Sequence, residues 1–432
     1  MWLIVRRWRV TAGTLLSGPE MWGVVGEEQA ALNVIALGAP GAGKTTYLAA
    51  LHHEVKSDPF PGVSVSLAQS AQAAELDRVY RQAADPSQGW PAATRTGEGL
   101  REFAFRLVVE ASRVNWRNQI VSARHPVMSL TYLDYAGEFI PDADLYEEEA
   151  AEFDERLGAA HALLGIIDGH QLLKYMLRCG PEEEERFLAN LARVVGRLKG
   201  AAQPVHFLVT KWDLFDGRFT FAQVRDALLA TPAETGFAVF VAKRTARRRF
   251  GRTLLGRVRL IPVSGYGGIA FLGEDMTVQR DPDGRLDQQN VIVPLAAAVA
   301  DIVDHFVQKA TVPRDAAEIE ADRQAAVEFG RAAQSASELK VGPTGVHINV
   351  FAMITAALVG VPRLGRLLIV PGKALGRSAR RQYRRVRARR LAGVRTVEGA
   401  AFYLADLIEA EMESFDIRFP DSMLTYEPPR RG

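Results

Sequence analysis

The sequence predicts an α/β fold, in which a mostly parallel sheet is covered by helices on both faces. Short apolar runs of β-prone residues alternate with segments of helical periodicity along most of the chain. Parallel strands need a crossover connection, usually a helix, so this alternation favours a parallel sheet. A glycine-rich turn between the first predicted strand and the first predicted helix points to the same class of fold.

The elements follow from apolar periodicity and from the Gly and Pro residues between them. Strands are predicted at residues 32–37, 103–110, 126–134, 162–168, 204–210 and 258–263. Helices are predicted at residues 44–55, 70–84, 145–157, 182–198, 221–229 and 290–309. The expected organisation is therefore an N-terminal segment (1–30), one α/β domain (31–310) and a C-terminal helical extension (311–432) that ends in an amphipathic helix at 397–415.

Composition describes an ordinary globular protein. The chain has 432 residues, of which 48% are hydrophobic and 24% charged. The one cysteine, Cys179, excludes an internal disulfide framework and a zinc site built on cysteines. It suits a reducing compartment, and the first twenty residues lack a signal-peptide layout, so we expect a cytoplasmic protein. Translation can start at Met1 or at Met21, and Met21 is favoured because the residues after it lead directly into the first strand.

The first strand runs into a G-x-x-x-x-G-K-T turn that opens a helix. Backbone N–H groups of such a turn, together with the positive end of the helix, bind a polyphosphate. Lys44 supplies a point charge for the β- and γ-phosphates, and the Thr45 hydroxyl supplies a ligand for Mg²⁺. The expected nucleoside triphosphate site consists of Gly38, Ala39, Pro40, Gly41, Ala42, Gly43, Lys44, Thr45 and Thr46.

Further signals lie at the ends of later strands, where an open α/β sheet binds its ligand. Asp134 ends one strand and begins Asp-Tyr-Ala-Gly-Glu. Its carboxylate can hold Mg²⁺ through water, and Gly137 leaves room for its own N–H to meet the γ-phosphate. Alone, such a D-x-x-G pattern is also common in plain turns, but its place after a strand and downstream of the glycine-rich turn strengthens it.

Two more strand ends point to a guanine base. Thr210-Lys211-Trp212-Asp213 places a carboxylate that can accept from guanine N1–H and N2–H₂ together, a donor pair that adenine lacks. Lys211 can lay its aliphatic stem over the base. After the strand at 258–263, a small-residue turn at Ser264 and Gly265 can offer backbone N–H groups to the guanine carbonyl.

In this order the four motifs resemble those of the translation-factor and Ras-like (TRAFAC) superclass of P-loop GTPases. The resemblance covers residues 32–309 and is strongest to bacterial GTPase domains of conflict or signalling systems, which sometimes occur as paired GTPases. It implies a P-loop NTPase fold with a Ras-like six-stranded sheet. It also implies binding of Mg²⁺ with GTP or GDP, GTP hydrolysis and a conformational switch, with Lys44, Thr45, Asp134, Gly137, Lys211 and Asp213 at the motif positions.

The chain also departs from the pattern of that superclass. Asp134 lies far beyond Lys44, which predicts a helical insertion around residues 56–100. Thr94 is the favoured switch threonine and metal ligand, and Thr96 is the alternative. Glu138 stands where Ras-like proteins carry the glutamine that orients water, and its carboxylate can act as a base or repel the γ-phosphate. We therefore expect slow hydrolysis that a partner's arginine accelerates. A P-loop ATPase and a scaffold that binds nucleotide without hydrolysis are the rival functions.

A basic block occupies residues 363–395, with twelve Lys and Arg and no Asp or Glu. The apolar stretch before it, 350–361, is shorter than the roughly 20 residues that span a bilayer, which favours a buried helix packed on the GTPase domain. Alternatively, residues 346–395 form a patch for an anionic membrane surface, or the block docks on an acidic surface of this chain or of a protein partner from the same operon or system. Nucleic acid is disfavoured, because Tyr383 is the one aromatic in the block.

Overall fold

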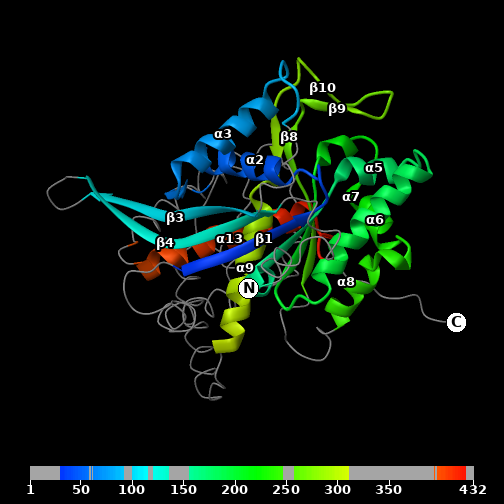
Figure 1. Ribbon diagram of the computed structural model, residues 1–432. Helices are drawn as coiled ribbons and strands as arrows, with labels where there is room; N and C mark the ends of the chain where they lie inside the picture. The colour runs from blue at the N-terminus through cyan, green and yellow to red at the C-terminus, as the bar shows by residue number, and fades with distance from the viewer. Residues whose placement is uncertain are drawn as a thin grey trace, which may run out of the picture.

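The computed structural model describes residues 30–57, 60, 62–91, 100–114, 120–135, 155–246, 257–310, 394 and 397–424. Its centre is a seven-stranded sheet with the order β2-β3-β4-β1-β5-β6-β7 (Figure 1). The strands are β1 (Ala30–Gly38), β2 (Val63–Leu67), β3 (Leu100–Val114), β4 (Ile120–Tyr135), β5 (Ala162–Ile167), β6 (Val205–Val209) and β7 (Val258–Pro262).

The predicted α/β class with a mostly parallel sheet is confirmed. β1 pairs in parallel with β4 and β5, and β6 joins β5 to β7 in the same direction, whereas β3 runs antiparallel to β2 and β4. The predicted strand count of six is wrong, because β2 adds a seventh strand at the edge. Its sequence, Val-Ser-Val-Ser-Leu, alternates apolar and polar residues as a half-buried edge strand does. The expected helical insertion therefore contains a strand as well as α3 (Ser70–Ala84).

Helices cover both faces of the sheet (Figure 1). On one face the core includes residues of α2 (Lys44–Lys56), α3, α9 (Val293–Ala310) and α13 (Val397–Arg418). On the other it includes residues of α5 (Gly169–Met176), α6 (Pro181–Leu198), α7 (Phe221–Leu229) and α8 (Phe237–Ala246). Alternate residues of β1 supply the two cores, Val34 and Ala36 on one side and Ile35 and Leu37 on the other.

The C-terminal helix α13 belongs to this core. Its Leu407 and Phe415 are fully buried, and the helix packs against α9. Beyond it the chain adds to the edge of the sheet: Leu260 N–H donates to the Ser422 carbonyl at 2.8 Å, and Leu424 N–H donates to the Val258 carbonyl at 2.8 Å. The predicted helix at 397–415 is confirmed, and it covers the sheet that the α/β domain forms. The predicted boundary at residue 310 stays a prediction.

Two small antiparallel pairs lie between β7 and α9. β8 (Ser264–Gly267) pairs with β11 (Asp287–Gln289), and β9 (Ala270–Leu272) pairs with β10 (Val278–Arg280) to form a hairpin. The sequence predicted a small-residue turn at Ser264 and Gly265. The structure instead makes these residues part of β8, since Ser264 pairs with Gln289 and Gly267 with Asp287.

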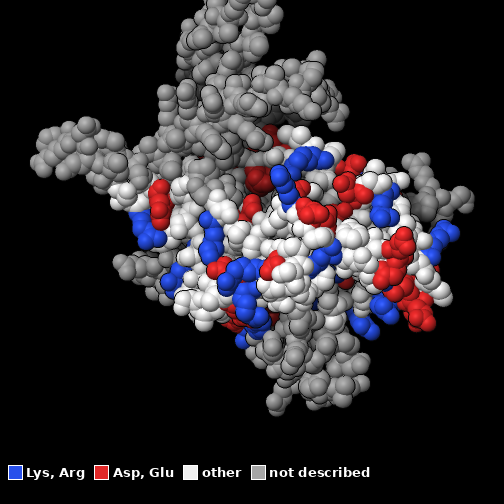
Figure 2. Space-filling model, turned by 90° about the horizontal axis from the view of Figure 1, so that it is seen from above, with Lys and Arg blue, Asp and Glu red and all other residues white. Residues whose placement is uncertain are grey.

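Several predicted features fall outside the described residues: the segment 1–29, most of the helix at 145–157, the apolar stretch at 350–361 and nearly all of the basic block at 363–395. Across the ranges that the structure does describe, no helix combines the length and apolar character that crossing a membrane requires. On the face seen in Figure 2, described acidic and basic side chains lie among one another.

Candidate functional site

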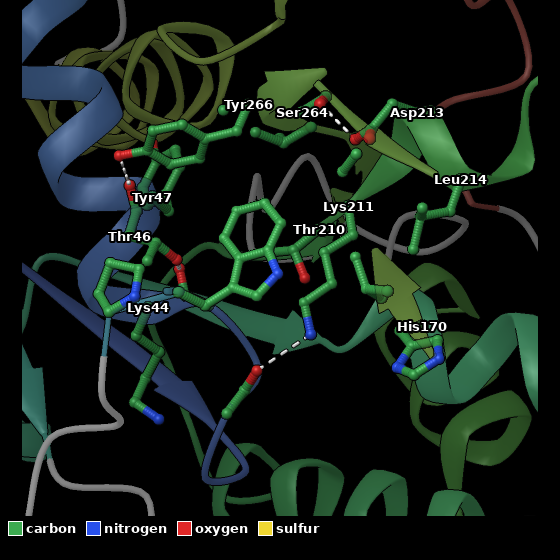
Figure 3. A pocket seen from close by; sticks show the side chains of 18 of the residues that line it. Lys44, Thr46, Tyr47, His170, Thr210, Lys211, Asp213, Leu214, Ser264 and Tyr266 are labelled. Carbon is green, nitrogen blue, oxygen red and sulfur yellow. Dashed lines mark hydrogen bonds between the residues drawn. The ribbon is translucent and has the colours of Figure 1, made fainter. Parts of the chain in front are cut away.

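A cavity of about 430 Å³ lies where β1, β6 and β7 end. Because these strands are parallel, their carboxyl ends meet at the same edge of the sheet, which is where open α/β sheets form ligand crevices. The glycine-rich turn after β1, the segment after β6 and the start of β8 all contribute to the wall. Figure 3 shows Lys44 at one end of the cavity and Asp213 with Ser264 at the opposite end.

The glycine-rich turn, Gly38 to Thr45, has the backbone that its composition predicts. Gly41 and Gly43 have φ values of 73° and 89°, a region that other residues enter at a cost. A Cβ on Gly38 would lie 2.9 Å from the Cβ of Ile166, so this position also needs a residue without a side chain. Gly43 caps α2 without a side-chain hydrogen bond, so an anion at this end of the helix could accept from its first N–H groups.

Lys44 is a buried cation at this end of the cavity. Its Nζ donates to the carbonyls of Gly38 at 2.8 Å and of Ala39 at 3.1 Å, and its exposed fraction is 7%. Burial lowers the pKa of Lys44, and the negative charge of Asp134 opposes that shift. Because burying a charge is costly, an anion in the cavity would stabilise the charged form of this side chain.

Asp134 lies behind the cavity wall, at the end of β4. Thr45 Oγ1 donates to its Oδ2 at 2.7 Å. The residue is almost fully buried, and within the described part of the chain its Oδ1 has no hydrogen-bond partner. Burial raises the pKa of Asp134, while the Thr45 bond and the Lys44 charge act in the opposite direction. A buried acceptor left without a donor is costly, which fits a position beside a hydrated cation.

The segment after β6 is tied to the glycine-rich turn. Thr210 Oγ1 donates to the Ala42 carbonyl at 2.8 Å, and Lys211 Nζ donates to the Gly41 carbonyl at 3.1 Å. Lys211 Nζ also pairs with Asp168 Oδ1 at 2.8 Å, and its backbone has the left-handed φ of 54°. These bonds hold the two ends of the cavity in a fixed relation.

Asp213 lies in a short 3₁₀ turn, η2 (Trp212–Phe215). The Ser264 hydroxyl donates to its carboxylate (Figure 3). Burial raises the pKa of Asp213, and the hydrogen bond from Ser264 lowers it. Gly265 lines the wall next to this pair, where a Cβ would come within 2.9 Å of the Ala50 Cβ. The arrangement presents a carboxylate and backbone groups at the end of the cavity opposite Lys44.

Most of the predicted site residues reach this cavity, directly or from behind its wall. Its lining includes Pro40, Gly41, Gly43, Lys44, Thr45, Thr46, Thr210, Lys211, Asp213, Ser264 and Gly265. Gly38, Ala39 and Ala42 contribute carbonyl acceptors beneath it. Thr94, Thr96, Gly137 and Glu138 fall outside the described residues, so their predicted roles stay predictions.

The cavity also contains side chains that the sequence did not indicate. Trp90 comes from the loop after α3, His170 from the first turn of α5, and Tyr266 from β8. Val278 and Thr277 come from the β9–β10 hairpin and its turn. No motif marks these positions, because the segments that carry them are far apart in the sequence and meet only through the fold.

Comparison with known proteins adds no assignment: no protein-family model matches this chain, and no curated protein matches it. The function proposed below rests on the sequence motifs and on the geometry of the cavity.

Proposed function

We propose that this chain binds GTP and GDP with Mg²⁺ in the cavity and hydrolyses GTP slowly, as a switch protein of the TRAFAC superclass of P-loop GTPases. The observation that carries the proposal is that one cavity has a buried cation, Lys44, at one end and a half-buried carboxylate, Asp213, at the other. A guanine nucleotide has the complementary layout, with anionic phosphates at one end and a pair of N–H donors at the other.

The phosphate end uses backbone and cation together. In this proposal the N–H groups that begin α2 bind the phosphate oxygens, since the end of the helix is capped by Gly43 and carries a partial positive charge. Lys44 lies among the carbonyls of Gly38 and Ala39 and would transfer its Nζ bonds to the β- and γ-phosphates. A phosphate would then place an anion within hydrogen-bond reach of this buried cation.

Thr45 and Asp134 are the residues that would hold Mg²⁺. The Thr45 hydroxyl donates a hydrogen bond to Asp134 Oδ2 at 2.7 Å. The second carboxylate oxygen of Asp134 is buried and has no hydrogen-bond partner among the described residues. Hard oxygen ligands of this kind suit Mg²⁺, which keeps several of its waters and is completed by substrate phosphates. The bound ion would neutralise charge on the phosphates. Thr94 is the proposed third ligand.

The base end selects guanine by hydrogen bonding. Asp213 would accept from N1–H and N2–H₂ of guanine, and the bond from Ser264 keeps the carboxylate oriented and favours its ionised form. Gly265 offers backbone at the wall for the guanine carbonyl. Lys211, fixed by Asp168, would lay its stem along one face of the base.

The hydrolytic part of the proposal rests on Gly137 and Glu138. The Gly137 N–H would meet the γ-phosphate. Glu138 would orient or deprotonate the attacking water, and repulsion between its carboxylate and the γ-phosphate would keep hydrolysis slow. We further propose that residues 311–432 couple the bound nucleotide to a protein partner, or to an anionic membrane surface through residues 346–395, from a cytoplasmic location.

The test is nucleotide affinity measured by calorimetry on the purified protein and two variants of Asp213. Wild type should bind GTP more tightly than ATP, and Asp213→Ala should lose that preference. Asp213→Asn should instead gain affinity for XTP, because its amide donates to the extra carbonyl of xanthine. Equal affinity of wild type for ATP and GTP, with no effect of Asp213→Ala, would mean that the chain is a P-loop ATPase or another nucleotide-binding protein.

Hydrolysis is tested separately by phosphate release from GTP. Glu138→Gln should change the turnover rate, and an unchanged rate would show that Glu138 lies away from the reacting phosphate. A wild-type protein that binds GTP but releases no phosphate, alone or with its partner, would be a nucleotide-dependent scaffold.

A further inference from the structure

Parts of the chain outside the four motifs also line the cavity, and among them the β9–β10 hairpin lies against η2, which carries Asp213. Trp90 and Pro91 follow α3 in the insertion, while Thr277 and Val278 belong to the β9–β10 hairpin. His170 of α5 completes this group. Three separate segments therefore contribute to the cavity wall, and the contacts between them hold that wall in shape.

Arg280 of β10 joins the hairpin to the insertion. One terminal guanidinium nitrogen donates to the carbonyls of Ala83 and Asp85 at 2.8 and 2.7 Å, and the other donates to those of Gln82 and Gly89 at 3.1 and 3.3 Å. The last carbonyls of a helix have no partner within the helix, and a cation is favourable at that end. Arg280 therefore caps the C-terminal end of α3 and holds the loop that follows it.

The same guanidinium covers the indole of Trp90. Its central carbon lies 4.0 Å from the centroid of the Trp90 ring, a close cation–π contact. Trp90 keeps an exposed fraction of 37% and lines the cavity. The indole is thus held from one side by a charge that hydrogen bonds have already fixed in place, and it still presents aromatic surface to the cavity.

The hairpin that carries Arg280 is fixed at its other end. His170 Nε2 lies 2.8 Å from the Met276 carbonyl, and since a carbonyl only accepts, the Nε2 carries the proton. The backbone N–H of His170 donates to Asp168 Oδ1, the same carboxylate that pairs with Lys211. The hairpin is therefore attached to the insertion on one side and, through His170 and Asp168, to the proposed base-binding segment (residues 210–213) on the other.

We infer that Trp90 is the aromatic surface on which the base of a bound nucleotide stacks, and that Arg280 is the positioning residue that holds the indole against the cavity. This inference rests on the proposed function and adds to it: the hydrogen bonds of Asp213 choose the base, and stacking on Trp90 stabilises any base that enters. Arg280 acts through Trp90 and does not touch the nucleotide.

The experiment compares affinities for GTP and for inorganic tripolyphosphate, which has no base. Trp90→Ala should weaken GTP binding about tenfold and leave tripolyphosphate binding within about twofold, because stacking acts on the base alone. Trp90→Phe, which keeps an aromatic face, should remain within about threefold of wild type for GTP. Equal losses for both ligands, or no loss for either, would overturn the inference.

Arg280→Lys tests the positioning role, since one ammonium cannot reach four carbonyls and cover a ring. It should weaken GTP binding about fivefold, but it should have no further effect in a Trp90→Ala background. Losses that multiply in the double variant would show that Arg280 acts only by closing α3, and would overturn its assignment. Arg81→Lys is the matched control: it removes an exposed guanidinium from the last turn of α3 and should change GTP affinity less than twofold.

The outcome for wild type separates this inference from the proposed function. If wild type fails to prefer GTP in a manner that depends on Asp213, the proposed function is wrong. If wild type shows that preference but Trp90→Ala binds GTP as tightly as wild type, only the role of Trp90 and Arg280 is wrong.

Discussion

The two ends of the cavity are built in different ways. At the proposed phosphate end, residues 38–46 are consecutive, and the roles proposed for them follow from glycine backbone geometry and from the start of α2. At the proposed base end, Trp90, His170, Asp213 and Val278 come from four segments that are far apart in the sequence. A local site can be predicted from its own residues, whereas an assembled one depends on the whole fold.

The largest effect is expected at the phosphate end. Lys44→Ala should weaken binding of GTP and of tripolyphosphate by about 100-fold or more, because the lost bonds are charge-assisted and the variant cannot balance the phosphate charge. Calorimetry with both ligands measures this. An equal loss of affinity for the two ligands is expected because both carry phosphates and only GTP carries a base. A loss confined to GTP would contradict the assignment of Lys44 to the phosphate end.

Gly169→Ala tests the backbone contact that fits α5 against the base-binding segment. A Cβ there would lie 1.9 Å from the Thr210 carbonyl oxygen, so α5 or the strand end must move. We expect the free energy of unfolding to fall by about 2–3 kcal/mol. Denaturant melts measure it, with Gly196→Ala as control: that helical position has nothing within 4 Å and should gain about 0.5–1 kcal/mol. Equal stability of the two variants would contradict the close contact.

Acid should destabilise the half of the sheet that carries the base-binding segment. His206 on β6 is fully buried, and burial, followed by the charge of Arg259, lowers its pKa to about 3. In the unfolded chain, a histidine binds a proton near pH 6.5. The contribution of His206 to the free energy of unfolding is therefore fully present above that pH and is lost as the pH falls towards 3. Because of His206, the free energy of unfolding should fall by about 2 kcal/mol between pH 7 and pH 5. Denaturant melts of wild type and His206→Asn without nucleotide measure it, and an unchanged pH slope in the variant would contradict the assignment.

The smallest effect is expected at α7, which follows the base-binding segment. Thr220 Oγ1 accepts from the Gln223 N–H, and the Gln223 side chain accepts from the Thr220 N–H, a complete capping box. Thr220→Ala should lower the free energy of unfolding by about 1 kcal/mol and leave the affinities for GTP and tripolyphosphate unchanged. A change in GTP affinity would show that the base end depends on α7 as well.

Most elements with an apolar pattern were predicted closely, including the short strands β5, β6 and β7. The helices at 70–84 and 221–229 match α3 and α7, because each has a clear apolar stripe and residues that stop a helix around it. β9 and β10 have three residues each, too few to show a period. β2 was missed although its five residues alternate apolar and polar. β3 and β4 extend well beyond the predicted strands, since their pairing with each other supports residues that show no apolar pattern of their own.

Some residues of the candidate site could likewise be predicted from the sequence, and others could not. Lys44, Thr45 and Asp213 could be chosen from the sequence because fixed spacings place them after strands. The Arg280–Trp90 contact could not, because the loop around Trp90 is rich in Pro, Gly and polar residues that indicate only a turn. The bond between Ser264 and Asp213 was also missed, since it depends on β8 being a strand rather than a small-residue turn.

The position of α13 makes the folded unit discontinuous in sequence. Residues 397–424 return to the core and to the edge of β7, whereas α9 ends at Ala310. Both ends of the intervening stretch are therefore anchored on one body. A fragment that stops after α9 would expose the side of the core that Phe415 fills. It would also leave backbone groups of β7 unpaired, and an exposed strand edge of this kind promotes aggregation. A fragment designed to isolate this unit should therefore omit the stretch between α9 and α13 and keep α13 with the residues that follow it.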